Sequence, residues 1–325
     1  MMDDMILTIA NVMGSGLRQA VPLILLAMGG LMAERSGTVD IGLEGKLLLS
    51  AFAGAAVASL TGSVPMALLA AVLTSVFFSM LHGFATINQK GDHVVSGLAI
   101  NVMASGLTLV LGQAWFHKGG QTPALTDELR FKPITFWGVD ALHDVPVIGP
   151  IYEKVISGHH IFAYVAVASV VLTAFILYRT RLGLRIRAVG DEPNAVDTAG
   201  LSVVRLRYLA LVYNGVMCGL AGVCLSMAQN SSFGREMSAG MGYMALAAVI
   251  FGKWRPWPAF WACILFGLLA ALSDRLQGVP MFGLKEIPSQ VFSALPYLFT
   301  IVLLASFVGK SIAPKAIGRP YVKER

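Results

Sequence analysis

Three acids and a lysine stand close together in ERSGTVDIGLEGK, residues 34–46, between two apolar stretches. Charged groups at membrane depth are costly and usually functional, so Asp40 and Glu44 are candidate contacts for a solute or ion that crosses a bilayer. Three glycines punctuate the segment and indicate a broken helix or a tight re-entrant turn. An interfacial loop whose charges pair with one another explains the same residues equally well.

Four of the side-chain amides inside otherwise apolar stretches are candidate contacts for a solute. Asn101 falls within 94–116, whereas the other three fall within 208–234; they are Asn214, Gln229 and Asn230. Such amides either join two helices by a hydrogen bond or contact a solute in a central cavity. Both interpretations stay open on the sequence.

A short helix is predicted within the basic segment TRLGLRIRAVGDEPNAVDTAGLSVVRLR, residues 180–207. An acid precedes Pro193, which suits the first helical position, and residues 194–199 make roughly two turns. Gly200 suits the left-handed position that ends a helix. Since a topological loop does not need a capped helix, we interpret it as a docking element for a cytoplasmic partner.

The segment SSFGREMSAGMGYMALAAVIFGKWRPWP, residues 231–258, repeats the pattern of 34–46. A charged, glycine-punctuated entry again leads into an apolar run. Two such breaks on opposite membrane faces suggest the two halves of an inverted repeat.

The composition requires a bilayer around these motifs. Of 325 residues, 56% are hydrophobic and only 13% are charged, against about a quarter in soluble domains. A membrane helix needs roughly 20 residues, so the long stretch 47–89 holds two spans. We therefore predict one all-α transmembrane domain, residues 1–325, with about nine helices, some of them broken or re-entrant. The stretches free of Asp, Glu, Lys and Arg are 19–33, 47–89, 94–116, 161–178, 208–234, 237–252, 256–273 and 287–309.

Lys and Arg orient the chain. The loop 179–207 and the tail 310–325 are rich in both and are predicted to be cytoplasmic, which agrees with the four segments between them. The loop 117–160 then lies outside, in the periplasm. The formal charge of +6 is explained by basic residues on one membrane face, beside anionic lipid, and calls for no nucleic acid.

The sequence carries no catalytic motif of the GxSxG, HExxH or P-loop type, so we predict neither an enzyme nor ATP hydrolysis through a P-loop by this chain. The histidines of the loop 117–160 match no usual metal-ligand spacing, and no metal site is predicted.

Three segments in register resemble a known family: ERSGTVDIGLEG, GLRIRAVGDEPNAVDTAG and GMGYMALAAVIFGKWRP. Over residues 18–308 the chain resembles bacterial ABC-importer permeases of the branched-chain amino acid and ribose type, in particular their simple-sugar and purine-nucleoside branch. The resemblance implies a multi-pass protein of the bacterial inner membrane that forms the path for a nucleoside or simple sugar.

The resemblance also implies partners. These are a periplasmic or lipoprotein binding protein, a second permease chain that is often a paralogue, and a cytoplasmic ABC ATPase that binds the ATP, so that this chain binds no cofactor directly. The helix 193–199 corresponds to the element that seats in the ATPase. The residues carried over to that contact are Arg187, Gly190, Asn194, Ala195 and Gly200.

The chain departs from the family pattern at two positions. Asp40 stands where asparagine is usual, and Lys46 stands where an apolar residue is common. An alternative hypothesis is a secondary transporter driven by an ion gradient, with Glu34, Asp40 and Glu44 as proton or cation sites. A membrane-embedded enzyme would need His, Asp and Glu clustered within the spans, and the spans are nearly free of them.

Overall fold

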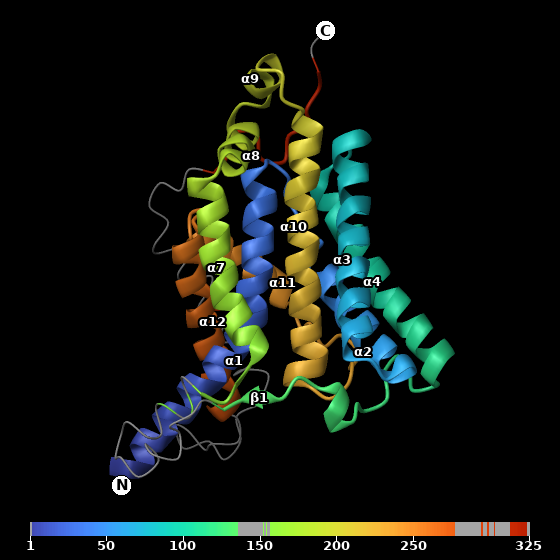
Figure 1. The fold of residues 1–325 in the computed structure, drawn as a ribbon, viewed down its shortest axis with the longest axis vertical. Helices are drawn as coiled ribbons and strands as arrows, with labels where there is room; N and C mark the ends of the chain where they lie inside the picture. The colour runs from blue at the N-terminus through green and yellow to red at the C-terminus, as the bar shows by residue number, and fades with distance from the viewer. Residues whose placement is uncertain are drawn as a thin grey trace.

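The computed structural model describes residues 2–135, 157–276 and 313–323, and single positions at 152, 154, 294, 298 and 302. Apart from positions 294, 298 and 302, the predicted last segment, 287–309, lies outside this description, as does part of the predicted loop 117–160. Within it, the chain is a bundle of helices with one two-residue strand pair (Figure 1).

The elements follow one another from helix α1 to helix α12. In chain order they are α1 (Met2–Arg35), α2 (Leu43–Thr61), α3 (Val64–Gly83) with the π-helical turn η1 (Phe84–Asn88), α4 (His93–Phe116), the 3-10 turn η2 (Asp127–Leu129), β1 (Pro133–Ile134), β2 (His159–His160), α7 (Ile161–Arg179), α8 (Arg181–Asp191), α9 (Pro193–Thr198), α10 (Val203–Val223) with the π-helical turn η4 (Cys224–Gln229), α11 (Met241–Phe251) and α12 (Pro256–Leu276).

Seven helices of the described part are long and apolar enough to cross a membrane, which confirms an all-α membrane protein. The prediction of about nine segments is approximate. The stretch 237–252 forms only the short helix α11, because residues 230–240 are not helical. The stretch 19–33 is part of a much longer helix, since α1 continues through Arg18, whose guanidinium bonds the Ser15 hydroxyl at 3.0 Å.

The first break in the bundle follows α1. Residues 36–42 are non-helical, and Gly37 has φ +87°, a conformation that glycine adopts without strain. Helix α2 then begins near mid-height and runs back toward the end of the bundle that carries β1 (Figure 1).

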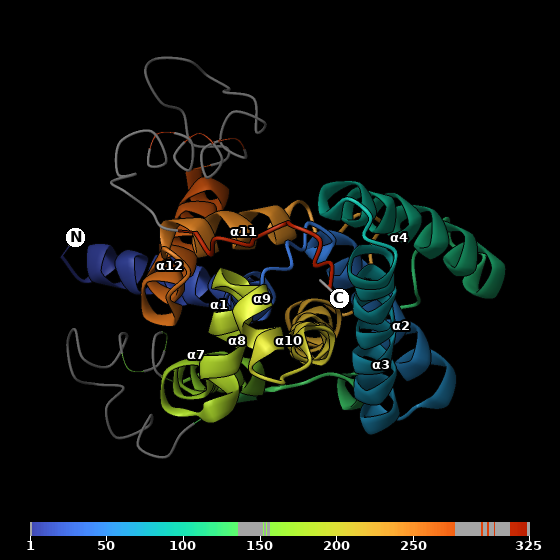
Figure 2. The same ribbon diagram turned by 90° about the horizontal axis from the view of Figure 1, so that it is seen from above.

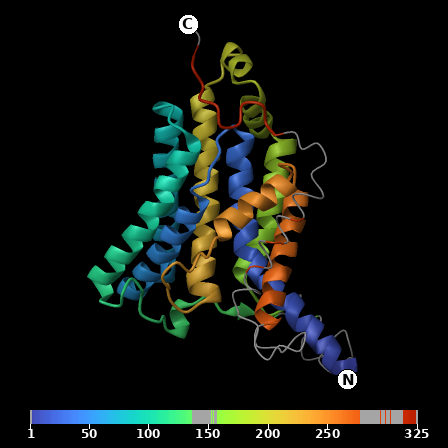
Figure 3. The same cartoon turned by 180° about the vertical axis from the view of Figure 1, so that it is seen from behind.

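The second break follows α10. Residues 230–240 are again non-helical, and α11 begins near mid-height and runs obliquely toward the end that carries α9 (Figure 3). Helices α2 and α11 therefore run from mid-height toward opposite ends of the bundle, the arrangement expected of an inverted repeat. We call them the half-helices for this starting point, although α2 alone, at 19 residues, is long enough to cross a membrane.

Small residues allow the central helices to pack closely. Gly215 and Gly219 lie one turn apart on α10, and a Cβ on either would lie 2.6 Å from the Cα of Val76 or Val72 of α3. Such close backbone approach is the usual way in which membrane helices associate. It holds α10 beside α1 and α3 at the centre of the bundle.

Helices α8 and α9 and the segment 313–323 lie at one end of the bundle, called here the α9 end (Figures 1 and 2). The strand β1 lies at the opposite end, called here the β1 end. The loop 179–207 and the described tail thus share an end. The assignment of that end to the cytoplasm stays a prediction.

Candidate functional site

A buried ion pair fixes the first break. The side chains of Asp40 and Lys46 are both 0% exposed, and the Lys46 ammonium donates to the Asp40 carboxylate. The same carboxylate accepts from the Asn214 amide of α10 and, at 3.1 Å, from the Gly42 N–H. The two charges therefore compensate each other, and Asp40 and Asn214 lie in the interior of the bundle. Their contact with a solute stays a prediction.

Two histidines hold the backbone of the same break. The Val39 carbonyl accepts from Nε2 of His82 at 2.9 Å, which leaves Nδ1 to accept from the Ser96 hydroxyl at 3.0 Å. The His93 ring lies 6.0 Å from the His82 ring, edge to face. The break is thus bound to α3 and α4 as well as to α10.

Glu44 joins the two half-helices. Its carboxylate accepts from the Gly240 N–H at 2.8 Å and from the Gly242 N–H at 2.6 Å, at the first turn of α11. A carboxylate suits a helix N-terminus because the N–H groups there lack partners within the helix and carry partial positive charge. The start of α11 is therefore attached to the start of α2.

Asn101 of α4 bonds the start of both half-helices. Its Oδ1 accepts from the Gly45 N–H at 2.8 Å, and its Nδ2 donates to the Ile41 carbonyl at 3.1 Å and to the Tyr243 hydroxyl at 2.8 Å. The Asn101 amide thus makes hydrogen bonds between helices, which is one of the two roles that the sequence allows; the other is contact with a solute. Its hydroxyl partner is 43% exposed on α11.

A polar strip follows α4 and α11 on one side of the bundle. We call it the polar side and define it by Asn101, Ser105, Glu236 and Tyr243; the Ser105 hydroxyl donates to the Glu236 carboxylate, which is exposed. Lipid hydrocarbon offers such groups no hydrogen bonds, so a carboxylate and a phenol near mid-height do not belong on a lipid-facing surface. The polar side therefore requires protein or water against it.

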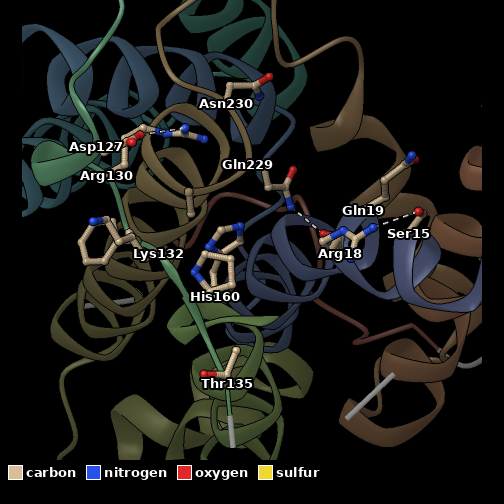
Figure 4. A pocket seen from close by; sticks show the side chains of 13 residues that line it. Ser15, Arg18, Gln19, Asp127, Arg130, Lys132, Thr135, His160, Gln229 and Asn230 are labelled. Carbon is tan, nitrogen blue, oxygen red and sulfur yellow. Dashed lines mark hydrogen bonds and ion pairs between the residues drawn. The ribbon is translucent and has the colours of Figure 1, made fainter. Parts of the chain in front are cut away.

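A cavity of about 940 Å³ lies beside the strands β1 and β2, with Pro133 and His160 in its lining (Figure 4). Gln229 and Asn230 line it, together with cationic side chains of α1 and of the segment before β1. The Gln229 amide donates to the Arg18 carbonyl, and the Asn230 amide donates to the Leu225 carbonyl at 2.9 Å. These two candidate path residues therefore lie apart from Asp40 and Glu44.

The electrostatics of this cavity are cationic. Among the described residues, its lining includes Arg18, Arg130 and Lys132 and one acid, Asp127, which lies 3.8 Å from Arg130. Burial lowers the pKa of the His160 imidazole and outweighs the hydrogen bonds to the backbone of Phe131 and Lys132, which raise it, so the uncharged ring is favoured at neutral pH. The cavity therefore favours a neutral or anionic occupant.

The five residues assigned to an ATPase contact divide into two groups. Asn194, Ala195 and Gly200 are exposed on or beside α9, which projects from the bundle (Figure 1). Gly200 has φ +79°, the left-handed conformation predicted for it. This group forms a free surface at the α9 end.

The other two residues face the bundle. The Arg187 guanidinium lies 5.2 Å above the ring of Tyr178, and a Cβ on Gly190 would lie 2.2 Å from the Arg35 carbonyl oxygen. They attach α8 to α7 and to the end of α1. Whether any of the five contacts an ATPase stays a prediction.

The acids of the alternative hypothesis are already paired. Asp40 bonds Lys46, and Glu44 bonds two backbone N–H groups. Glu34 accepts from the indole N–H of Trp254. In the part of the chain that the structure describes, none of the three presents a free carboxylate for proton or cation exchange.

Sequence reasoning did not assign His82, Ser105, Glu236 or Tyr243 to the site, although Glu236 belongs to the charged entry of the segment 231–258. A search for charged interruptions passes over histidine, serine and tyrosine. Glu236 and Tyr243 fall within the segment 231–258. Its glycine pattern predicts a break in the helix, but it does not predict that helix α4 lies against that break. The spacing of Asn101 and Ser105, four residues apart, is the one signal that could place both on one face of α4.

Comparison with known proteins gives a family and several relatives. The family model described as branched-chain amino acid transport system / permease component matches residues 12–308. The nucleoside ABC transporter permease protein NupC of Lactococcus lactis is 36% identical, over 98% of this chain and 98% of the relative. The guanosine ABC transporter permease protein NupQ of Bacillus subtilis is also 36% identical, over 98% and 99%. A second L. lactis protein, the nucleoside ABC transporter permease protein NupB, is 23% identical over 94% of this chain and 83% of its own length.

Proposed function

Because the chain belongs to the branched-chain amino acid transport system permease family, and is a multi-pass inner-membrane transport subunit rather than an enzyme, we propose that it imports a nucleoside. The substrate class is supported by the names of two relatives that match it over nearly their whole length. A simple sugar, the other member of this branch, is the second candidate.

The observation that carries the transport role is the pair of opposed half-helices. Transporter sites form where discontinuous helices of an inverted repeat begin near the bilayer midplane. Here α2 and α11 both begin near mid-height and run toward opposite ends. Glu44, in the first turn of α2, accepts a hydrogen bond at the start of α11, and Asn101 makes hydrogen bonds with the first turns of both helices. If the half of the bundle that contains α2 rocked against the half that contains α11, the region between the starts of these two helices would open alternately to each end of the bundle.

The polar side is the proposed lining of the path. Its hydroxyl, amide and carboxylate groups are the types that bind ribose hydroxyls and base edges by hydrogen bonds. Gln229 and Asn230, in the cavity at the β1 end, lie where a solute would enter from the outer face. Asp40 and Asn214 serve instead to fix the break behind this lining.

Proteins of this family work with ATPase and substrate-binding partners. We propose that the α9 end faces the cytoplasm and binds an ABC ATPase, which holds the ATP, and that a periplasmic or lipoprotein binding protein delivers the solute to the β1 end. The second permease chain would be a paralogue. The two related permease proteins of one L. lactis strain support such a pair.

Uptake of radiolabelled guanosine, adenosine and ribose by cells that express the whole transporter tests the function. We expect nucleoside uptake that requires ATP and survives collapse of the proton gradient. Uptake that follows the gradient instead would support the secondary transporter and contradict the proposal.

Replacing Tyr243 by Phe tests the lining. A lost neutral hydrogen bond is worth about 0.5–1.5 kcal/mol, so we expect the KM for the solute to rise roughly twofold to tenfold. Tyr164→Phe on α7, away from the polar side, is the matched control. An unchanged KM in Tyr243→Phe would remove this residue from the path.

A further inference from the structure

The segment 313–323 crosses the α9 end and touches both α8 and the first break. The Ala316 N–H donates to the Gly190 carbonyl, and the Gly318 N–H donates to the Gly37 carbonyl, each at 2.9 Å. Gly37 and Gly190 are themselves close, since a Cβ on Gly37 would lie 3.6 Å from the Gly190 Cα. The segment therefore bridges the end of α8 and the non-helical residues that precede α2.

Helix α10 binds the same segment through a buried cation. Arg207 is 0% exposed, and its Nη1 donates to the Arg319 carbonyl at 3.3 Å. Two other nitrogens of this guanidinium, Nε and Nη2, have no partner among the described residues. Because a buried cation is costly unless it is hydrogen-bonded, the carbonyl of the segment is its principal stabilising contact there.

Helix α9 is attached to the segment from outside. Lys315 pairs with Glu192 at 3.3 Å, and Lys323 pairs with Asp197 at 3.7 Å. Tyr321 packs against the apolar cluster that joins α8, α9 and α10, which contains Val189, Val196, Val203 and Leu206. Exposed ion pairs are weak, so the packing and the buried backbone bonds give this contact its stability.

We propose that residues 313–323 form a coupling strap, which transmits movement of α9 to the start of α2. The strap bonds Gly37, and only three residues later Asp40 bonds Lys46 in the first turn of α2. Glu44 then attaches the start of α11. A displacement of α9 by an ATPase thus reaches both half-helices through contiguous contacts, in addition to the direct contact of Gly190 with α1.

The inference rests on the proposed function. It gives the tail a role in coupling ATP hydrolysis to transport, beyond the orientation of the chain in the membrane that its basic residues explain. If the tail were only a basic membrane anchor, its backbone bonds to Gly37 and Gly190 would have no consequence for transport. If it is a strap, loss of those bonds uncouples ATP hydrolysis from uptake while the transporter stays assembled.

Ala316→Pro tests the strap in the complete transporter, because proline removes the N–H that bonds Gly190. Ala316→Ser keeps that N–H and is the matched control. We expect uptake per ATP hydrolysed to fall roughly tenfold in Ala316→Pro, within the range typical of coupling between sites, and to stay near the wild-type value in Ala316→Ser. Both variants should reach the membrane and copurify with the ATPase to the same extent.

Truncation provides a second test. A chain that ends at Lys323 keeps every contact of the strap described above, whereas one that ends before Ala313 keeps none of them, so only the second should be uncoupled. Unchanged uptake per ATP in Ala316→Pro, or loss of ATPase binding instead of coupling, would overturn the strap. A wild-type transporter that moves neither nucleoside nor sugar would overturn the proposed function, and the strap with it.

Discussion

At the scale of single residues, the acid at position 40 shows how a charge at membrane depth can be structural. Asp40 and Lys46 neutralise each other without exposure, and Asn214 and Gly42 also donate hydrogen bonds to the carboxylate. The cost of burying each charge is offset only while the other is present. The pair therefore behaves as one unit.

This mutual dependence predicts a non-additive pair of substitutions. Asp40→Asn or Lys46→Leu alone leaves one buried charge uncompensated and should destabilise the protein by roughly 3–5 kcal/mol. The double variant should regain most of that loss, because neither charge remains. The apparent melting temperature of the purified protein in detergent measures the effect. A double variant no more stable than the singles would show that the pair is not a unit.

The sequence could predict the types of these residues but not their pairing. It identified the acids and amides at 40, 44, 101 and 214 because each interrupts or lies in an apolar stretch. The bond between Asp40 and Lys46 depends on where helix α2 begins, which in turn depends on His82 and His93 from other helices. Such tertiary contacts leave no periodic signal in the chain.

At the scale of elements, the joint between α2 and α11 depends on the absence of a side chain at Gly242. A Cβ there would lie 2.4 Å from the Glu44 backbone nitrogen, whereas a Cβ on Gly106 of α4 meets nothing within 4 Å. Gly242→Ala should therefore strongly reduce the yield of folded protein. Gly106→Ala should be neutral or stabilising by about 0.5–1 kcal/mol. Size-exclusion profiles and melting temperatures compare the two, and equal behaviour would contradict the close joint.

Helix α9 offers the corresponding prediction at the α9 end. Asn194 is exposed, so Asn194→Trp should leave the fold intact and lower uptake roughly tenfold by obstructing the ATPase contact. Leu60→Trp, at an exposed position on α2 near the β1 end, is the control for an added indole. Normal uptake and normal solute-stimulated ATPase activity in Asn194→Trp would exclude α9 as the coupling element.

The long elements were predictable because membrane helices are apolar over their whole length. Helix α9 was predictable from Pro193 at its first position and Gly200 after its end, whereas the Glu192 side chain makes no capping hydrogen bond. Helix α8 was not predicted, since RLGLRIRAVGD has the composition of a positive-inside loop. Its helical form follows from burial of Gly183, Ile186, Val189 and Gly190 against the bundle. The short length of α11 likewise depends on Glu44, which bonds the first N–H groups of that helix from a distant segment.

At the scale of the whole molecule, the sides of the bundle differ in chemistry. Large apolar side chains are exposed on α3, α7 and α12, as lipid requires. Along α4 and α11, the described surface carries exposed apolar side chains together with the polar side, which consists of Asn101, Ser105, Glu236 and Tyr243. Seen from the α9 end, α11 lies between α12 and α4 on one side of the bundle (Figure 2). This is the side on which we place the second permease chain, with the path between the two chains.

A photoreactive residue can identify what covers each side. Val102 of α4 is 74% exposed beside the polar side, and Val171 of α7 is 51% exposed on an apolar side. Benzoylphenylalanine at 102 should form an adduct with the second permease on irradiation of membranes that hold the complete transporter, while the same residue at 171 should react with lipid. The yield at 102 should fall at least several-fold when the second permease is omitted. Equal adduct yields at the two positions would place the subunit interface elsewhere, and the polar side would then need another partner to shield its carboxylate from lipid.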